Sequence, residues 1–163
     1  MMSPETADPS GADGRPPTNE RPRIVVGVDA STESEDALRW AARYAEMVSG
    51  SLDVVHAWEL KNELAWLEPV PPPVNPTEIA REAMSAMLYR VLGPDWSSKG
   101  TMAIIEGHPA KVLMDRAKGA NLLVLGSRGL GGFDGLLIGS VSGTCATHAT
   151  CSVTIVREPP PER

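Results

Sequence analysis

The amino-acid sequence predicts a doubly wound α/β domain in which a parallel sheet of five strands is flanked by four helices. Two observations lead to this fold class. Short, nearly continuous apolar runs, typical of strands covered on both faces, alternate with segments that repeat apolar residues at helical spacing. Glycine, proline or a capping residue separates each run from the next. Such an alternation builds a parallel sheet with helices on both faces, and right-handed crossovers make it doubly wound.

The first strand is expected over 24–28, where the chain reads Ile-Val-Val-Gly-Val. Asp29 ends this run, and Ser31 is a candidate cap for the following helix, because its hydroxyl can accept a hydrogen bond from a first-turn amide. Apolar residues then recur at helical spacing as far as Gly50, which is expected to stop the helix. The second strand is expected over 52–58.

The second helix is expected to begin at Asn75 and Pro76, a capping residue followed by a proline at the first helical position. Its apolar face is expected to contain Ile79, Ala83, Met87, Leu88 and Val91. Gly93 ends the pattern, and a third strand follows over 101–106.

Two further pairs of helix and strand complete the expected domain. Pro109 lies at the start of the third helix, which ends at Gly119, and the fourth strand is expected over 122–125. After a glycine-rich loop, a short helix over 139–150 leads to the last strand at 152–156.

Both ends of the chain lack the apolar residues that a fold requires. Residues 1–22 are rich in proline and predict a disordered tail, and the charged, proline-rich segment 158–163 predicts a second tail. The folded domain is therefore expected over 23–157. Cys145 and Cys151 form no disulfide framework, which favours free thiols and a reducing cytoplasm, with a redox-active pair as the alternative.

The charge and the hydropathy of the chain exclude two classes of partner. The formal net charge is −6, and no run of lysine and arginine is present, so nucleic acid is not an expected partner. No apolar stretch approaches the roughly 20 residues that a membrane-spanning helix needs, so no membrane partner is expected either.

A glycine-rich loop is the strongest functional feature of the sequence. It runs from Gly126 to Ser140 after the fourth strand, and Asp29 follows the first strand. In doubly wound sheets, ligands bind beyond the carboxyl ends of the strands where the strand order reverses, so the two segments are expected to form one site. Backbone amides near Gly139, Ser140 and Val141, where a helix begins, would bind an anion.

This loop differs from the two common phosphate-binding loops. A Walker loop needs a lysine before its serine or threonine, and the loop has no lysine. The dinucleotide fingerprint would need glycine where the chain has Asp134, and it should follow the first strand rather than the fourth. Both interpretations are excluded.

Three features together resemble the ATP-binding branch of the universal stress protein family. That branch carries Gly, two residues, Gly, nine residues, then Gly followed by Ser or Thr. The same spacing is present here at Gly126, Gly129, Gly139 and Ser140. The opening Val-Gly-Val-Asp-Ala-Ser over 26–31 is similar to the family, and so is the final strand after a turn that contains Cys151. The resemblance covers 23–157. Ser152 departs from it, because a proline is common there.

The resemblance implies a nucleotide site with named roles. Asp29 would lie near the phosphates or ribose and help to hold Mg²⁺, and Ala57 would line the adenine pocket. Gly27 would lie beside the base, where some members carry a bulkier residue. Along the ribose and phosphates would lie Gly126, Arg128 and Gly129. Backbone and hydroxyl hydrogen bonds to the phosphates would come from Gly139, Ser140, Val141 and Ser142.

The implied function is that of an adenine-nucleotide-binding regulatory protein of the stress response. The resemblance also implies a homodimer joined through the last strand, 152–156. The residues do not distinguish ATP from AMP or cyclic AMP. One alternative is a weak ATPase or phosphotransferase, for which Asp29 is the candidate acidic group. The other is a nucleotide-free dimeric interaction module, in which Asp29 caps a turn and the glycines serve only loop conformation.

The histidines indicate no metal site. His56, His108 and His148 are far apart in the sequence and lack the spacing of metal ligands, so packed or solvated positions are expected for them.

Overall fold

The computed structural model describes residues 21–59, 75–130 and 137–157. Within these ranges one parallel sheet has the strand order β3-β2-β1-β4-β5. The strands are β1 (Arg23–Gly27), β2 (Ser51–Trp58), β3 (Gly100–Glu106), β4 (Leu122–Gly126) and β5 (Ser152–Val156). The helices are α1 (Thr32–Met47), α2 (Pro76–Leu92), α3 (Trp96–Lys99), α4 (Pro109–Arg116) and α5 (Ser140–His148). Apart from 21–22, the predicted tails lie outside the described residues.

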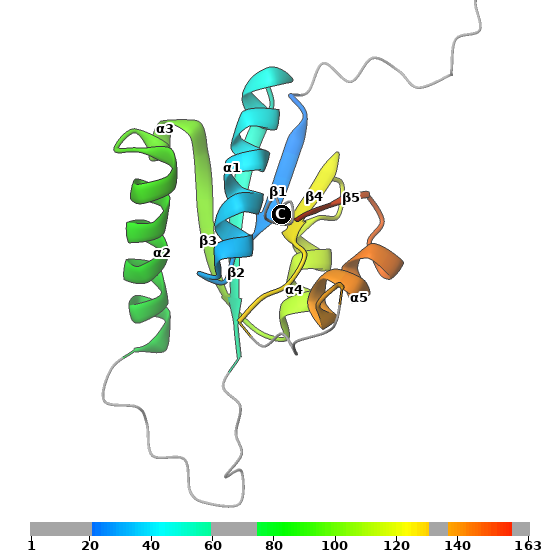
Figure 1. Cartoon of the computed structure of the whole chain (residues 1–163). Helices are drawn as coiled ribbons and strands as arrows, with labels where there is room; N and C mark the ends of the chain where they lie inside the picture. The colour runs from blue at the N-terminus through cyan, green and yellow to red at the C-terminus, as the bar shows by residue number, and fades with distance from the viewer. Residues whose placement is uncertain (1–20, 60–74, 131–136, 158–163) are drawn as a thin grey trace, which may run out of the picture.

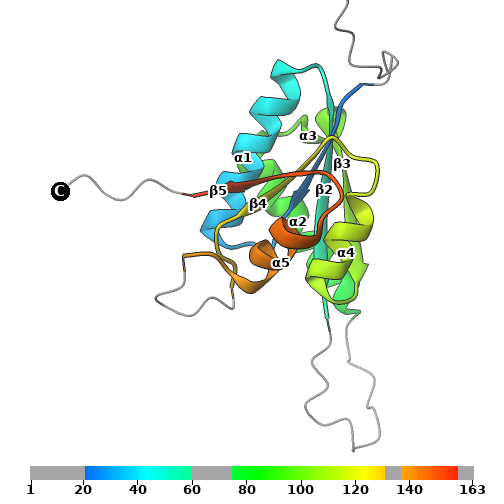
Figure 2. The same ribbon diagram turned by 90° about the vertical axis from the view of Figure 1, so that its right-hand side faces the viewer.

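The predicted fold class is confirmed: helices cover both faces of a five-stranded parallel sheet. Figures 1 and 2 show α1 and α2 on one face and α4 and α5 on the other. The prediction of four helices was one short, because the described residues also contain α3. With four residues, α3 is a single turn and too short to show an apolar period.

Alternating residues of the strands separate the core into two layers. Ile24 and Val26 of β1 are fully buried in the cluster that α1 and α2 cover. Val25, between them, is buried in the second cluster, which α4 and α5 cover. Because successive side chains of a strand point to opposite faces, a strand that is apolar at every position fits a sheet covered on both sides.

Two capping residues predicted from the sequence occupy the expected positions. The Ser31 hydroxyl accepts a hydrogen bond from the Ser34 amide at the start of α1, at 3.2 Å. The Asn75 side chain accepts one from the Thr77 amide at the start of α2, at 3.0 Å. Both interactions satisfy amides that have no partner within the helix.

The end of α1 differs from the expectation that Gly50 would supply the left-handed stop. Ser49 takes that conformation, with φ of 52°, and its amide donates to the Glu46 carbonyl. The Gly50 amide donates to the Ala45 carbonyl at 2.8 Å, which completes a Schellman motif. Glycine at position 50 has another cause: a Cβ there would lie 2.5 Å from the Pro22 carbonyl oxygen.

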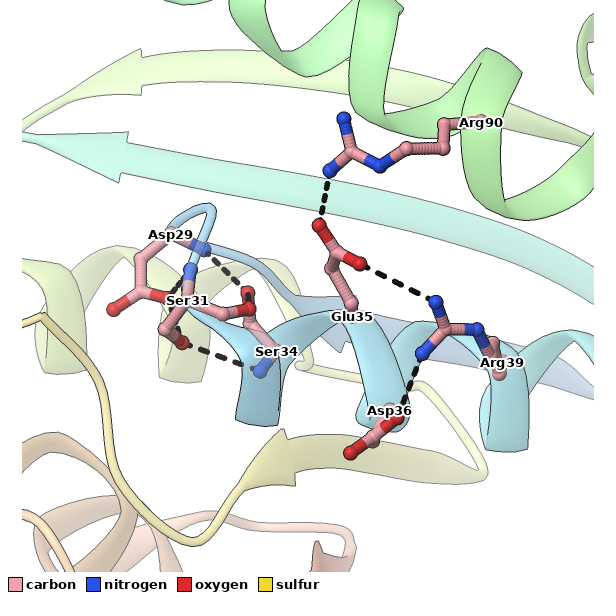
Figure 3. Close-up of polar contacts among 7 residues, drawn as sticks. All are labelled: Asp29, Ser31, Ser34, Glu35, Asp36, Arg39 and Arg90. Atoms are coloured by element: carbon pink, nitrogen blue, oxygen red, sulfur yellow. Dashed lines mark hydrogen bonds and ion pairs between the residues drawn. The ribbon is translucent and has the colours of Figure 1, made fainter.

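The buried face of α2 also differs in part from the predicted one. Met84, Met87 and Leu88 are its buried residues, whereas Ile79 is 54% exposed. The inward direction is set by contact with α1 and the sheet, and the apolar pattern of α2 is too diffuse to define it alone. Polar contacts add to this packing (Figure 3), since Glu35 of α1 pairs with Arg90 of α2.

Both cysteines are free in the structure. Burial raises the pKa of the Cys145 thiol to about 11 and also raises the pKa of Cys151. Since the thiolate is the reactive form, these shifts favour inert thiols over a redox-active pair. Among the described helices, none combines the length and the apolar character that crossing a membrane requires.

We predict that Ser49→Gly stabilises the protein. A left-handed conformation costs an L-residue about 1–2 kcal/mol, of which the extra freedom of glycine in the unfolded chain offsets about 0.5–1 kcal/mol. The free energy of unfolding in urea is therefore expected to rise by roughly 0.5–1 kcal/mol. Ser85→Gly, inside α2, is the control and is expected to lower it by about 0.5 kcal/mol. Equal effects of the two substitutions would contradict this explanation of the α1 terminus.

Candidate functional site

A cavity of about 490 Å³ lies at the carboxyl ends of β1, β2 and β4. This is the position where strand order reverses in a doubly wound sheet, and the volume is in the range of small-molecule sites. All ten residues that the sequence singles out line it: Gly27, Asp29, Ala57, Gly126, Arg128, Gly129, Gly139, Ser140, Val141 and Ser142. The structure thus brings them together, while their roles toward a ligand stay predictions.

Asp29 links the two segments of chain that border the cavity. Its Oδ1 accepts hydrogen bonds from the amide and the hydroxyl of Ser31, at 3.1 and 2.5 Å (Figure 3). Its Oδ2 accepts one from the Leu130 amide in the glycine-rich loop, at 2.9 Å. Ala30 lies in the left-handed region, with φ of 67°, so the turn that aims Asp29 carries local strain.

Two loop glycines are required by close contacts within the chain. A Cβ on Gly129 would lie 2.3 Å from Oδ2 of Asp29, and a Cβ on Gly126 would lie 2.8 Å from the Glu33 carbonyl. Both distances are shorter than real Cβ contacts. Glycine at these positions lets the loop approach the start of α1 and the Asp29 carboxylate.

Gly139 differs from these two glycines. The nearest atom to a Cβ there would be the Arg128 Cα at 3.4 Å, which is an ordinary contact. Its φ and ψ of −69° and 161° are open to any residue. The fold described by the structure therefore gives no reason for glycine at position 139, although the residue lines the cavity.

The first turn of α5 presents backbone amides at the edge of the cavity. The first bond of the helix runs from the Gly143 amide to the Gly139 carbonyl, at 2.8 Å, and no described side chain caps this end. The amides of Ser140, Val141 and Ser142 precede that bond, so they lack partners in the helical ladder. Such amides, at the positive end of a helix of nine residues, attract an anion.

Other donors near this turn are already used inside the chain. The buried Ser142 hydroxyl donates to the Gly126 carbonyl at 2.7 Å, and the Gly139 amide donates to the Ser127 carbonyl at 2.7 Å. These two bonds close the loop at its ends. The exposed Ser140 hydroxyl and the first-turn amides are therefore better placed to meet a ligand than the Ser142 hydroxyl is.

Among the described residues, the charged side chains around the cavity are Asp29, Glu59 and Arg128. Arg128 pairs with Glu33 of α1, with 3.4 Å between Nη2 and Oε1. These described side chains carry no excess of positive charge, so an anionic ligand would depend on backbone amides and on Arg128.

Several residues of the cavity were not predicted as site residues. His56 and His108 line it, and so do the apolar side chains of Val55, Leu113 and Leu125. Nδ1 of His56 lies 2.8 Å from the Val28 carbonyl oxygen, which can only accept, so this nitrogen carries a proton. Applying the rule for carboxyl ends to β2 and β3 as well as β1 and β4 would have indicated both histidines.

Metal binding by protein side chains alone has little basis in the described ranges. No three His, Cys, Asp or Glu side chains of residues 21–59, 75–130 and 137–157 gather where they could hold a metal ion. Asp29 is a single carboxylate with hydrogen bonds to both oxygens. Mg²⁺ commonly binds to one or two carboxylates together with substrate phosphates, and Asp29 fits that shared mode.

Comparison with known proteins gives a consistent result. The profile of the universal stress protein family matches residues 20–157. The universal stress protein Rv2623 of Mycobacterium tuberculosis is 31% identical over 147 residues, which are 87% of this chain and 47% of the relative. A universal stress protein of Mycolicibacterium smegmatis is 32% identical over 139 residues, with 82% and 45% covered. The chain spans about half the length of these curated relatives.

Solved structures share the fold. The universal stress protein UspA from Lactobacillus plantarum superposes with a TM-score of 0.67 at 22% identity, over 85% of this chain and 99% of that one. A universal stress protein in complex with cAMP has a TM-score of 0.61 at 23% identity, over 83% and 96%. One from Archaeoglobus fulgidus in complex with dAMP has a TM-score of 0.58, at the same identity and coverage.

We predict that two loop glycines respond differently to an added methyl group. Gly129→Ala forces a Cβ against Asp29, and such overpacking costs about 1–3 kcal/mol of unfolding free energy. Gly139→Ala meets no close atom, and the weaker N-cap is balanced by lower freedom of the unfolded chain, so the change is expected within about 0.5 kcal/mol. Urea unfolding measures both, and the Leu130 amide resonance should shift only in Gly129→Ala. Equal stability of the two variants would refute the Asp29 contact.

Proposed function

The chain belongs to the universal stress protein family, and on this premise we propose that it binds an adenine nucleotide, in first place ATP, in the cavity between Asp29 and the glycine-rich loop. The observation that carries the proposal is the first turn of α5 at the edge of that cavity, where no described side chain caps the amides that precede the helical ladder. The proposal is supported by relatives of the same fold that are described in complex with cAMP and dAMP.

The phosphates would lie against the start of α5. The amides of Ser140, Val141 and Ser142 point away from the helical ladder, and the Ser140 hydroxyl is exposed. Within the described residues no close contact explains glycine at position 139, and the missing side chain would let a phosphate approach the backbone there. The spacing of Gly126, Gly129, Gly139 and Ser140 supports a place in the ATP-binding branch of the family.

The base would lie deeper, between the ends of β1 and β2. Val55, Leu113 and Leu125 give this part of the cavity an apolar lining, and Ala57 lies at its edge on β2. A planar, weakly polar ring suits such a wall, while a few polar groups orient it. Gly27 faces the same space, where a Cβ would meet the Leu125 side chain at 2.7 Å.

Mg²⁺ is proposed to arrive with the nucleotide. Asp29 would supply one carboxylate oxygen, and phosphates and water would supply the rest. The ion would neutralise phosphate charge when bound. Asp29 itself holds the turn at Ser31 and the loop at Leu130, so it would couple the ligand to the loop conformation.

We favour regulation by nucleotide occupancy over turnover. Hydrolysis needs a group that orients the attacking water, in addition to metal and phosphate contacts. Asp29 is engaged in three hydrogen bonds, and the other carboxylate in the cavity, Glu59, is exposed just after β2. A ligand-responsive role in the stress response therefore fits this site better than an ATPase does.

Dimerisation through β5 is the second part of the proposal. β5 lies at an edge of the sheet, and its residues from Val153 to Val156 are half-buried in the single chain. An apolar edge strand invites pairing with another strand unless it is covered. A second copy of the chain would cover this edge.

Nucleotide binding is expected to depend on the start of α5. In Ser140→Glu, the new carboxylate suits the helix terminus, so the fold is kept, but it repels phosphates and occupies their site. Calorimetric titration with ATP, AMP and cyclic AMP, with and without Mg²⁺, is expected to show binding to the wild type and at least about tenfold weaker binding to Ser140→Glu.

Ala146→Glu is the matched control for that measurement. It adds the same charge at an exposed position of α5 outside the cavity. Its affinity is expected to stay within about threefold of the wild type, because exposed charges are screened by salt. A wild type that binds none of the three nucleotides would refute the proposed function and leave the nucleotide-free interaction module.

The β5 contact is expected to decide the oligomeric state. Ile155→Lys places a charge on the edge strand, which should disfavour strand pairing, so analytical ultracentrifugation is expected to show a dimer for wild type and a monomer for the variant. Ile79→Lys makes the same exchange at an exposed position of α2 and should remain dimeric. A monomeric wild type, or dissociation by both substitutions, would refute the contact through β5.

A further inference from the structure

A second cavity lies at the opposite end of the sheet from the proposed nucleotide site. Its lining comes from the amino ends of β1, β2 and β3, from α3 and from the end of α4. The residues that line it are mostly polar or charged: Arg21, Arg23, Ser51, Asp53, Ser97, Ser98, Lys99, Thr101 and Arg116, with Gly50, Leu52 and Gly100.

Asp53 is the buried centre of this cavity. It is 5% exposed on β2 and faces α4. Arg116 donates to both carboxylate oxygens, from Nε at 2.8 Å and from Nη2 at 3.1 Å. Thr101 and Arg23 donate further hydrogen bonds, at 3.0 and 3.3 Å. Both oxygens of the Asp53 carboxylate therefore have hydrogen-bond donors. The hydrogen bonds to Asp53 raise the pKa of Arg116.

The two arginines have different capacities for a further ligand. Arg23 also donates from Nη1 and Nη2 to the carbonyls of Arg116 and Lys118, which are unpaired groups at the end of α4. Its guanidinium is therefore committed to the fold. Arg116 uses only its Nε and Nη2 edge on Asp53, and within the described residues no hydrogen bond reaches its Nη1. Its second edge is open to a bidentate acceptor.

The charge of this cavity is opposite to that of the whole chain. Arg21, Arg23, Lys99 and Arg116 line it, against the single carboxylate of Asp53. Lys99 also meets Glu46 at 3.4 Å, a pair in which both side chains are largely exposed. A surplus of positive charge is thus concentrated here in a protein of formal net charge −6. Arg23 and Arg116 share the single carboxylate of Asp53, so the cations that line the cavity outnumber its carboxylates.

We propose that this cavity is an anion site that binds a phosphoryl group, either free phosphate or a small phosphomonoester. A guanidinium edge matches two phosphate oxygens, and a flexible lysine adds a point charge. Asp53 is a positioning residue, because it holds Arg116 with its open edge outward. The hydroxyls of Ser51 and Ser97 line the same space and supply neutral donors.

Titration of the ¹⁵N-labelled full chain at constant ionic strength tests the proposal. Inorganic phosphate is expected to cause saturable shifts of the Ser51, Lys99 and Thr101 amides, and any shift at Ser140 reports the separate site at the start of α5. O-phosphoserine, in a second titration, distinguishes a phosphomonoester from free phosphate as the better ligand, and acetate should bind more weakly than either. Acetate that binds as tightly as phosphate would overturn the assignment to a phosphoryl group.

A matched pair of charge reversals makes the test specific. Lys99→Glu is expected to weaken phosphate at least about tenfold, since it replaces attraction by repulsion at the site. Lys111→Glu changes the net charge equally on the exposed surface of α4, outside the cavity, and is expected to weaken it less than about twofold. Equal weakening by both, shifts that do not saturate, or shifts centred on Ser140 would overturn the proposal. The last outcome would leave the nucleotide site standing.

Discussion

Parallel pairing of β1 with β4 is the constraint on which the candidate nucleotide site depends. The register places Val26 beside Val124, so the two strands end together although about a hundred residues separate them. The turn after β1 and the glycine-rich loop after β4 must then share one edge of the sheet. The hydrogen bond from the Leu130 amide to Asp29 is the local result of that topology. Helices on opposite faces leave the space between the loops uncovered, which is the reversal point of a doubly wound sheet.

The glycines of the loop have unequal physical causes, although they form one motif. Gly126 and Gly129 are required by the chain itself, because a Cβ would strike Glu33 or Asp29. Gly139 has an ordinary backbone and ordinary surroundings. The spacing of glycines therefore does not by itself indicate that each glycine contacts a ligand. Within this motif, the described contacts do not explain Gly139, which adjoins the first-turn amides of α5. Gly139 is therefore the glycine that best supports the proposal of a ligand.

Local signals predicted much of the fold, and tertiary contacts decided what was missed. The strands and the caps at Ser31 and Asn75 follow from residues close in sequence, and both caps have the expected bonds. The exposure of Ile79 depends on how α2 meets α1, and the need for glycine at position 50 depends on its approach to the Pro22 carbonyl. The ten expected site residues, most of which the family resemblance implied, lie together in one cavity because the strands before them end at the same edge of the sheet. His56 and His108 were missed because they belong to no motif with a recognisable spacing, and only their positions near the ends of β2 and β3 place them at the cavity.

The two proposed anion sites, one at each end of the sheet, would use different chemical means. At the carboxyl ends, the described charged side chains are two carboxylates and one arginine, so attraction for phosphate would come from Arg128 and from the amides of α5, which require no pairing acid. At the amino ends, the charge comes from lysine and arginine side chains, and the buried carboxylate of Asp53 holds two of the arginines. Backbone donors are fixed by the fold, whereas lysine and arginine side chains are flexible. A ligand at the first site would therefore be bound by geometry, and a ligand at the second by charge.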